Sequence, residues 1–419
     1  MIQSNARPVD AGTSVPEAEE LVCRARSFQT LLREQQQQCE ERGHPSAEVA
    51  DALRKAGLFR ILSPRRYGGY EMPLPVFYSV IMEIARGCPS TGWWYALGAG
   101  HAVQVSSYLE QEGQDEIFAK GPDFSAPWSF NSRNARIVPV DGGYRVSGNW
   151  AFCSGAPHAD FFMGGMSVAD VEGRMTSHEN SWVSSTLTVV VPKGRFQILD
   201  DWGDMLGMRG SGSNSVVLED VFVPHHMTIR MNRAPTLLGD TPGTRLHGGN
   251  PLYGGLFQAF AEGSLAAMAV GTAEAAIDEY VHLLKTRNDG LTGRLRVDVE
   301  DYQRTLGLAV VTVDTARAAA IRGAEIYMET AQRSVRKVAP FTNEVGVRLD
   351  GMYHVVERLV GEVVESLLRT ASSSATRNGQ KLQRYHRDVT TLRSRREQLD
   401  FCAAGIALEY LKADQARKA

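Results

Sequence analysis

The segment from Trp202 to Pro224 constrains the fold more than any other part of this 419-residue chain. It begins as a polar loop punctuated by glycine and continues into a strand of alternating apolar residues. The polar side chains of the loop are Arg209, Ser211, Ser213 and Asn214. Backbone N–H groups, hydroxyls and one guanidinium together suit a phosphate or the polar edge of a ring. The segment therefore predicts a binding loop that leads into a β-strand.

The patterning along the chain changes twice. Residues 1–15 form a polar tail, and up to residue 123 the apolar residues recur at helical spacing, with Ser46 as a helix N-cap. From residue 124 to 231, short β-branched and aromatic runs indicate strands, and Asp141-Gly-Gly marks a hairpin. Residues 232–255 are typical of a linker or mobile loop, and helical patterns follow over 262–285, 298–334, 344–373 and 386–412. We therefore expect an N-terminal helical domain (1–123), a middle β domain (124–231) and a C-terminal helical domain (232–419).

Composition narrows the functional class. The 45 basic and 48 acidic residues are mixed along the chain, which argues against a nucleic-acid partner. Five scattered cysteines without a Cys-x-x-Cys pair fit a reducing cytoplasm, and they argue against disulfides and a metal site. The N-terminus lacks a signal-peptide pattern. The longest uncharged run, residues 87–109, contains Pro89 and His101, so we expect buried helices there and no membrane span.

Two further segments carry candidate chemistry. In the first, Trp150, Phe152 and Ser154 alternate along a strand that ends at Gly155, so two rings and a hydroxyl share a face that a planar ligand can approach. The same pattern also fits a core strand of a β-sandwich, and both interpretations stand.

The second segment is Ser90-Thr-Gly-Trp93-Trp94, which is followed by His101. Histidine is the side chain best suited to accept a phenolic proton near neutral pH, although a histidine in such an apolar region also fits the core. Trp93 and Trp94 either wall an aromatic pocket or pack between helices.

In this order, the segments resemble the acyl-CoA dehydrogenase superfamily, and most of all its oxygenase branch. The resemblance rests on Trp-x-Phe-x-Ser-Gly at 150–155, the loop at 202–214, Val-Phe-Val-Pro at 221–224 and Pro-Leu-Tyr at 251–253. That branch holds the oxygenase components of two-component (group D) flavin-dependent monooxygenases. The resemblance spans nearly the whole chain and implies an α+β fold: an N-terminal helical domain, a middle antiparallel β domain and a C-terminal four-helix bundle.

The resemblance also implies a reaction. Reduced FMN or FAD, delivered by a separate NAD(P)H-flavin reductase, reacts with O2 to give a C4a-hydroperoxide that hydroxylates an aromatic, phenolic or polyketide-type small molecule. It places Ser154 at the flavin N5 edge, where it stabilises the hydroperoxide, and His101 at the substrate hydroxyl. The other implied flavin contacts are Phe152, Cys153, Trp128, Ser129, Arg209 and Ser211. Trp128 and Ser129 contact the flavin or the substrate, or simply begin a strand. Arg209 and Ser211 match positions that either contact the flavin or stabilise the loop. The other implied substrate contacts are Trp93, Trp94, His386 and Arg395.

The C-terminal region separates oxygenase from dehydrogenase. Acyl-CoA dehydrogenases carry a glutamate base in a Tyr-Glu-Gly turn after an Arg-x-x-Arg-Asp helix start. This chain keeps Arg384-Tyr-His-Arg-Asp388 but has no such turn, and a general base contributes about 100- to 10,000-fold to rate. Aromatic hydroxylases of the group often have a second histidine where this chain has Arg395. That arginine suits an anionic or carbonyl-bearing substrate, or it pairs with a carboxylate.

Three alternatives remain open at this point. The first is an N- or S-oxygenase with the same flavin chemistry, as in amino-sugar N-oxygenation. The second is a dehydrogenase whose base is Glu344, Glu357 or Glu365, and the third is a flavin-free helical scaffold. The superfamily resemblance also implies a homotetramer, with the helix at 265–277 forming a four-helix core between subunits, although a dimer is an alternative.

Overall fold

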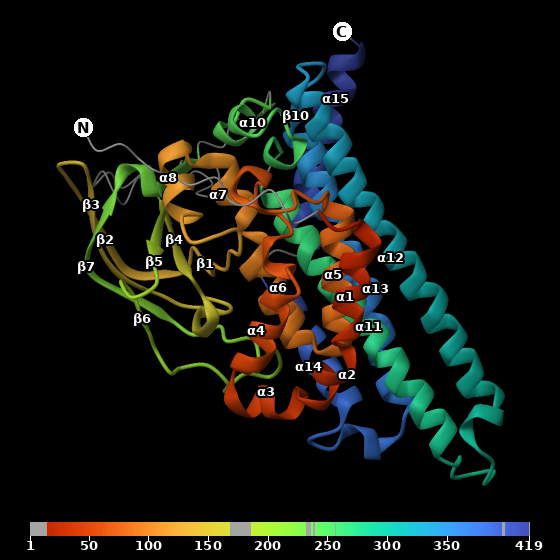
Figure 1. Cartoon of the computed structure of the whole chain (residues 1–419). Coiled ribbons are helices and arrows are strands. Elements are labelled where there is room, and N and C mark those ends of the chain that lie inside the picture. Colours follow the sequence, from red (N-terminus) through yellow and green to blue (C-terminus); the bar gives the residue numbers. More distant parts are fainter. Residues whose placement is uncertain are drawn as a thin grey trace.

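The computed structural model describes residues 15–167, 186–231, 236–237, 239–255, 257–395 and 399–418. In Figure 1 the strands lie on one side, the N-terminal helices occupy the middle, and the long C-terminal helices form the opposite side. This order of helical, β and helical regions confirms the predicted α+β architecture. We retain the boundaries after residues 123 and 231 as a proposed division.

The N-terminal region is helical, as predicted, and Ser46 caps α4 by accepting a hydrogen bond from the Val49 N–H. The central α5 packs against α1, α6 and α11, so it joins the two helical regions. The helices of this region are α1 (Ala18–Ser27), α2 (Gln29–Glu34), α3 (Gln36–Arg42), α4 (Ala47–Lys55), α5 (Leu74–Gly87), α6 (Pro89–Gly100), α7 (Ala102–Tyr108) and α8 (Gln111–Ile117).

The middle region contains two four-stranded sheets, in the orders β1-β4-β5-β8 and β2-β3-β7-β6. The strands are β1 (Trp128–Ser129), β2 (Ser132–Val140), β3 (Gly143–Trp150), β4 (Phe161–Ser167), β5 (Thr186–Pro192), β6 (Gln197–Ile198), β7 (Val216–Pro224) and β8 (Thr228–Met231). Strands β2 and β3 form the hairpin predicted at Asp141, and the pairs are antiparallel except for the parallel pair β1–β4. Trp150 pairs with Val216, so the turn after β3 lies beside the loop that precedes β7. We call this loop, residues 202–214, the glycine loop.

The C-terminal region is a bundle of long helices, flanked by the short pair β9 (Thr236–Leu237) and β10 (Phe341–Thr342). Its helices are α10 (Pro242–Leu246), α11 (Phe257–Thr286), α12 (Glu300–Val335), α13 (Asn343–Thr370), α14 (Lys381–Arg393) and α15 (Leu399–Lys418). Among the described residues, no helix is long and apolar enough to cross a membrane.

Three expectations for this region were wrong. The described part of the expected linker contains α10, which begins with a capping box between the buried Thr241 and Thr244. The helix expected over 386–412 is two helices, α14 and α15. Most side chains of residues 265–277 are buried against α5, α12 and α13 of the same chain, so this helix cannot form a core between subunits.

Helix α6 links the N-terminal core to the β domain. Trp94 is fully buried, with its ring 5.2 Å from that of Phe59 and 5.3 Å from that of His158. The neighbouring Trp93 is only half-buried because it lies about 100° further round the helix.

We expect Trp94→Ala to lower the free energy of unfolding by about 3–5 kcal/mol, because it leaves a large cavity in the core. Trp93→Ala is the matched control and should cost clearly less. Urea unfolding followed by circular dichroism measures both. Equal losses for the two variants would contradict the assignment of Trp94 to the core.

Candidate active site

Three serine hydroxyls and one indole N–H are linked by hydrogen bonds at the junction of α6, the turn after β3 and the glycine loop. We call this set of hydrogen-bonded groups the hydroxyl chain. Trp93 Nε1 donates to Ser154 Oγ at 2.8 Å. Ser154 Oγ also lies 2.8 Å from Ser213 Oγ, and Ser213 Oγ lies 2.7 Å from Ser211 Oγ. All three serines are buried. The chain brings together two residues predicted as flavin contacts, Ser154 and Ser211, and one predicted as a substrate contact, Trp93.

Phe152 marks the exposed side of this junction. Its φ is +60°, a left-handed conformation that costs a bulky residue on the order of 1–3 kcal/mol. Its ring is 52% exposed and lies edge-on to the Trp202 ring, with 6.1 Å between centroids. The neighbouring Cys153 N–H donates to the Asn214 carbonyl at 3.2 Å, so the glycine loop holds the turn in place. A strained, exposed aromatic residue held in this way is typical of a functional site.

Two other predicted flavin contacts point into the protein. Cys153 is fully buried, its thiol donates to the Trp150 carbonyl at 3.2 Å, and burial raises its pKa to about 12. Ser129 Oγ donates to the Ala151 carbonyl at 2.7 Å and accepts from the Asn131 N–H. Both side chains bind the local backbone, so the structure places them behind the site.

His101 lies at the end of α6, where it caps the helix and begins the turn into α7. It is 4% exposed, and its Nδ1 lies 2.7 Å from the Ala126 carbonyl oxygen. Because a carbonyl only accepts, Nδ1 carries the proton and Nε2 carries the lone pair. Burial lowers the pKa of His101 to about 4, so the ring is neutral at pH 7.

Trp128 stands beside His101, with 6.4 Å between ring centroids, and its indole N–H donates to Thr188 Oγ1 at 3.2 Å. Trp93 and His101 are eight residues apart on one helix, which corresponds to roughly 12 Å along its axis. Ser154 and His101 therefore lie at two ends of the face that α6 turns toward the β domain. Trp94, by contrast, is a core residue and not a pocket wall.

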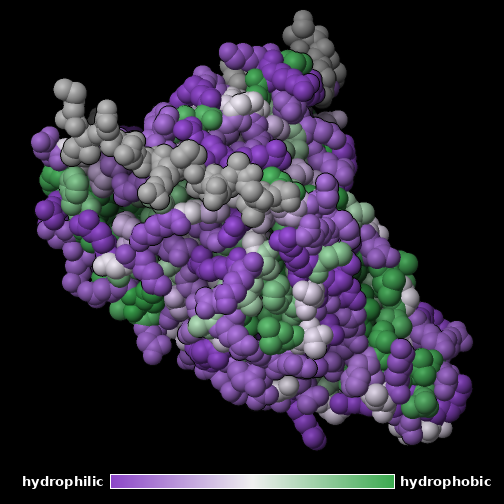
Figure 2. Space-filling model, viewed as in Figure 1, coloured by the Kyte–Doolittle hydropathy of each residue, from purple (hydrophilic) through white to green (hydrophobic). Residues whose placement is uncertain are grey.

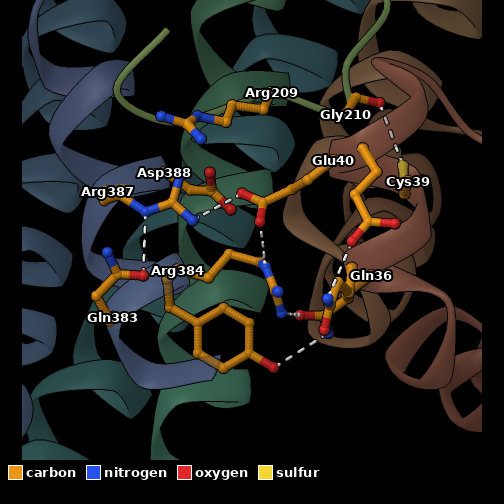
Figure 3. Close-up of polar contacts among 12 residues, drawn as sticks. Gln36, Cys39, Glu40, Arg209, Gly210, Gln383, Arg384, Arg387 and Asp388 are labelled. Atoms are coloured by element: carbon orange, nitrogen blue, oxygen red, sulfur yellow. Dashed lines mark hydrogen bonds and ion pairs between the residues drawn. The ribbon is translucent and has the colours of Figure 1, made fainter. Parts of the chain in front are cut away.

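Arg209 stabilises the glycine loop to which it belongs. Its Nε donates to the Met205 carbonyl at 2.5 Å, which folds the loop back on itself. Figure 3 shows Arg209 above Arg387 and Asp388 of α14. The structure thus places Arg209 in a supporting position, one of the two roles that the sequence left open.

Arg395 pairs with carboxylates, which is the second of the two roles that the sequence allowed for it. Its guanidinium donates to Glu262 at 3.1 Å and to Glu357 at 2.7 Å, and both acids are buried. Burial raises the pKa of Glu262, and Arg395 opposes this shift. Burial works against a charge on His354, but Glu357 and Glu262 raise its pKa above the usual value. An arginine held by two acids is not poised for an anionic substrate.

Glu262, His354 and Glu357 are also close enough to share a cation, since their ligand atoms lie within 4.8 Å of one another. The guanidinium of Arg395 already supplies a positive charge to both carboxylates. We therefore assign no metal to this cluster.

His386 is half-buried on α14, and its carbonyl accepts from Thr390. Within the described part of the chain, no hydrogen bond joins its ring to the hydroxyl chain. Sequence reasoning missed Glu262 and Asp388 as parts of the site, and it named Ser213 only as one polar residue of the predicted binding loop. Only Ser213 had a usable signal, because Ser211 and Ser213 are two residues apart and so share one side of an extended loop.

Comparison with known proteins identifies the family of the two helical regions and the fold. Residues 16–120 match the N-terminal domain family of acyl-CoA dehydrogenases, and residues 264–396 match the C-terminal domain family. Among solved structures, that of XiaF from Streptomyces sp., in complex with FADH2 and glycerol, has a TM-score of 0.82 and 22% identity. The match covers 94% of this chain and 96% of that protein, and it shows the shared fold.

Two curated relatives carry the comparison beyond the fold. The flavin-dependent monooxygenase oxygenase subunit HsaA of Rhodococcus jostii is 30% identical over 363 residues, covering 85% of this chain and 89% of the relative. The oxygenase component of the FADH2-dependent resorcinol hydroxylase of a Rhizobium species is 31% identical over 263 residues, covering 62% and 61%. The chain therefore belongs to the family of flavin-dependent monooxygenases with the acyl-CoA dehydrogenase fold, as an oxygenase component of the two-component type.

Proposed function

We propose that this oxygenase component takes reduced FMN or FAD from a separate NAD(P)H-flavin reductase and uses O2 to hydroxylate an aromatic or phenolic small molecule. The observation that carries the proposal is the chain of hydroxyls from Ser211 through Ser213 to Ser154, which ends beside the exposed Phe152. The resorcinol hydroxylase among the relatives supports the substrate class.

The residues at this junction fit a flavin. Phe152 and Trp202 offer an apolar surface for a planar ring, and the glycine loop lets backbone come close to it. Ser154 offers a hydroxyl beside them. A bound reduced flavin would supply the activation of O2, and the residues of this chain would bind it, orient it and exclude water.

Ser154 acts as an oriented donor in this proposal. Its oxygen accepts the Trp93 N–H, and it accepts the Ser213 O–H when Ser211 donates to Ser213. The Ser154 O–H then points away from both partners, toward the ligand. Donors in such a buried chain polarise one another, which strengthens the final hydrogen bond.

His101 acts at the substrate. With Nδ1–H fixed on Ala126, Nε2 is the acceptor that would hold a phenolic proton and make the ring carbon more nucleophilic. Burial keeps the imidazole neutral, so Nε2 accepts a hydrogen bond from the substrate hydroxyl over the whole neutral range.

A second candidate, N- or S-oxygenation, is supported by Arg395. This residue stands where aromatic hydroxylases of the group often have a second histidine, and here it is held by Glu262 and Glu357. A dehydrogenase is less well supported, because Glu357 is engaged with Arg395 and Glu365 is exposed on α13. Isotope labelling with ¹⁸O2 separates the three, since the product shows oxygen on carbon, on nitrogen or sulfur, or on neither.

The activity test combines the protein with a flavin reductase, NADH, flavin and a panel of phenols. We expect Ser154→Ala to lower hydroxylation by about 10- to 1,000-fold while H2O2 release rises, because one oriented donor is lost. Ser129→Ala is the matched control, since the Ser129 hydroxyl binds the backbone of Ala151 and Asn131, and it should keep the wild-type ratio of product to H2O2. An unchanged ratio in Ser154→Ala would contradict the role of Ser154.

His101 also makes a pH-dependent contribution to stability. The unfolded histidine takes up a proton near pH 6.5, whereas the folded one does so only near pH 4, so stability falls as pH drops through this window. We expect wild type to lose about 2 kcal/mol more than His101→Gln between pH 7 and pH 5. Urea unfolding at the two pH values measures the difference. Parallel losses would mean that folding leaves the pKa of His101 unchanged, which would contradict a desolvated imidazole.

We also propose a homotetramer, now through other surfaces than residues 265–277. Leu308 and Val311 of α12 are 62% and 59% exposed, and Leu408 and Leu411 of α15 are 54% and 58% exposed. Contiguous exposed apolar side chains of this kind favour subunit contacts.

Light scattering should therefore give four times the chain mass of 46.0 kDa. The double variant Leu408→Asp/Leu411→Asp should give a smaller species, whereas Leu291→Asp, at a 98% exposed position outside these helices, should not. A monomeric wild type at micromolar concentration would rule the tetramer out.

A further inference from the structure

One side of the glycine loop rests on α14. A Cβ added at Gly207 would lie 2.2 Å from the Arg387 carbonyl oxygen, so loop and helix backbones are in direct contact. Arg387 Nη1 also donates to the Leu206 carbonyl at 2.7 Å. The loop conformation is therefore set by α14 as well as by its own sequence.

Met208 connects α14 to the hydroxyl chain, because it is hydrogen-bonded to both Asp388 and Ser211. Its φ is +55°, and its N–H donates to Asp388 Oδ1 at 2.6 Å. The Met208 carbonyl accepts from Trp202 Nε1 at 3.2 Å and from the Ser211 N–H at 3.1 Å. Because surrounding contacts must over-determine a strained residue, the bond from Asp388 fixes Met208 and, through its carbonyl, Ser211.

Asp388 is buried in a setting that compensates its charge poorly. It is 1% exposed, and Oδ2 has no hydrogen-bond partner within the described part of the chain. The two arginines nearby on α14 are both engaged by Glu40 of α3, at 2.9 Å for Arg384 and 2.8 Å for Arg387 (Figure 3).

Burial and the charge of Glu40 raise the pKa of Asp388 to about 7, while the Met208 N–H and Arg387 oppose the shift. The remaining titratable group that faces Asp388 is the thiol of Cys88, just before α6, which shifts it in the same direction as Glu40. The carboxyl group therefore changes its charge within the neutral pH range.

We infer that Asp388 is a positioning residue for the glycine loop: its ionised carboxylate holds Met208, and protonation of that carboxylate loosens the loop and weakens binding of reduced flavin. A hydrogen bond to an ionised acceptor is roughly twice as strong as one to a neutral acceptor, so the loop is held best above the midpoint of the titration. The inference rests on the proposed function, since it takes the loop to be part of the flavin site.

The first test needs no flavin. Trp202 reports the loop directly because its indole binds the Met208 carbonyl. The fluorescence of Trp202, taken as wild type minus Trp202→Phe, should titrate between pH 5.5 and 8.5 with a midpoint near 7. In the Asp388→Asn background, the same difference should be flat, because the amide keeps an acceptor for Met208 but cannot ionise. A flat wild-type curve would overturn the inference, even if Asp388→Asn fails to fold.

The second test is an anaerobic titration with reduced FMN and reduced FAD at pH 6 and pH 8. Between pH 8 and pH 6, the ratio of the wild-type Kd to the Asp388→Asn Kd should rise roughly five- to tenfold. This is the effect of weakening one charge-assisted hydrogen bond in the wild type. Any titration of the flavin itself is common to both proteins and cancels in this ratio. Asp278→Asn is the matched control, since Asp278 binds Arg33 and Arg86 away from the loop, and it should follow wild type.

The outcomes separate the two proposals. If wild type binds no reduced flavin, the proposed function fails, and the Trp202 titration alone decides the role of Asp388. If flavin binds and the wild-type to Asp388→Asn ratio of Kd is the same at both pH values, the role of Asp388 is wrong and the proposed function stands. A lower melting temperature of Asp388→Asn with an unchanged ratio would likewise reduce Asp388 to a purely structural role.

Discussion

The register between β3 and β7 is the constraint on which the rest of the site depends. Trp150 lies opposite Val216, so the chain that leaves β3 and the chain that enters β7 run side by side beyond the sheet. Backbone hydrogen bonds continue the contact there, among them those from Cys153 to Asn214 and from Gly155 to Gly212. A slip of one residue would turn Ser154 away from Ser213, because side chains alternate between faces.

Helix α6 is the second fixed element, and a glycine lets it approach. Gly155 has φ of +85°, and a Cβ there would lie 2.2 Å from the Trp94 ring, so the turn accepts the helix only because the side chain is missing. Burial of Trp94 then sets the rotation of α6. That rotation carries Trp93 to Ser154 at one end of the helix and His101 to Ala126 at the other. The two candidate catalytic residues thus have their positions fixed by one rigid helix.

The sequence predicted those parts of this arrangement that depend on residues close together in the chain. Helical periodicity and the Asp141 hairpin led to the order of helical, β and helical regions, and the family resemblance of the Trp-x-Phe-x-Ser-Gly segment led to the fold class and to Ser154. What it could not show depends on distant partners: Trp93 and Trp94 differ only in which side of α6 meets the core. Arg395 meets Glu262 across 133 residues, and Asp388 meets Met208 across 180. No local pattern encodes such pairs, because each is set by how whole helices pack.

These long-range pairs show two ways in which buried carboxylates are accommodated in the protein core. Glu262 and Glu357 share Arg395, and such a buried pair is costly to break, on the order of 3–5 kcal/mol, because one uncompensated charge would remain. Asp388 has no such partner of its own, since Glu40 already engages both arginines beside it. A chain selected for stability alone would replace that carboxyl group by an uncharged acceptor. The presence of a carboxyl group at a point where α14 holds the glycine loop is explained if the charge itself is used there, because departures from good packing chemistry gather at functional sites.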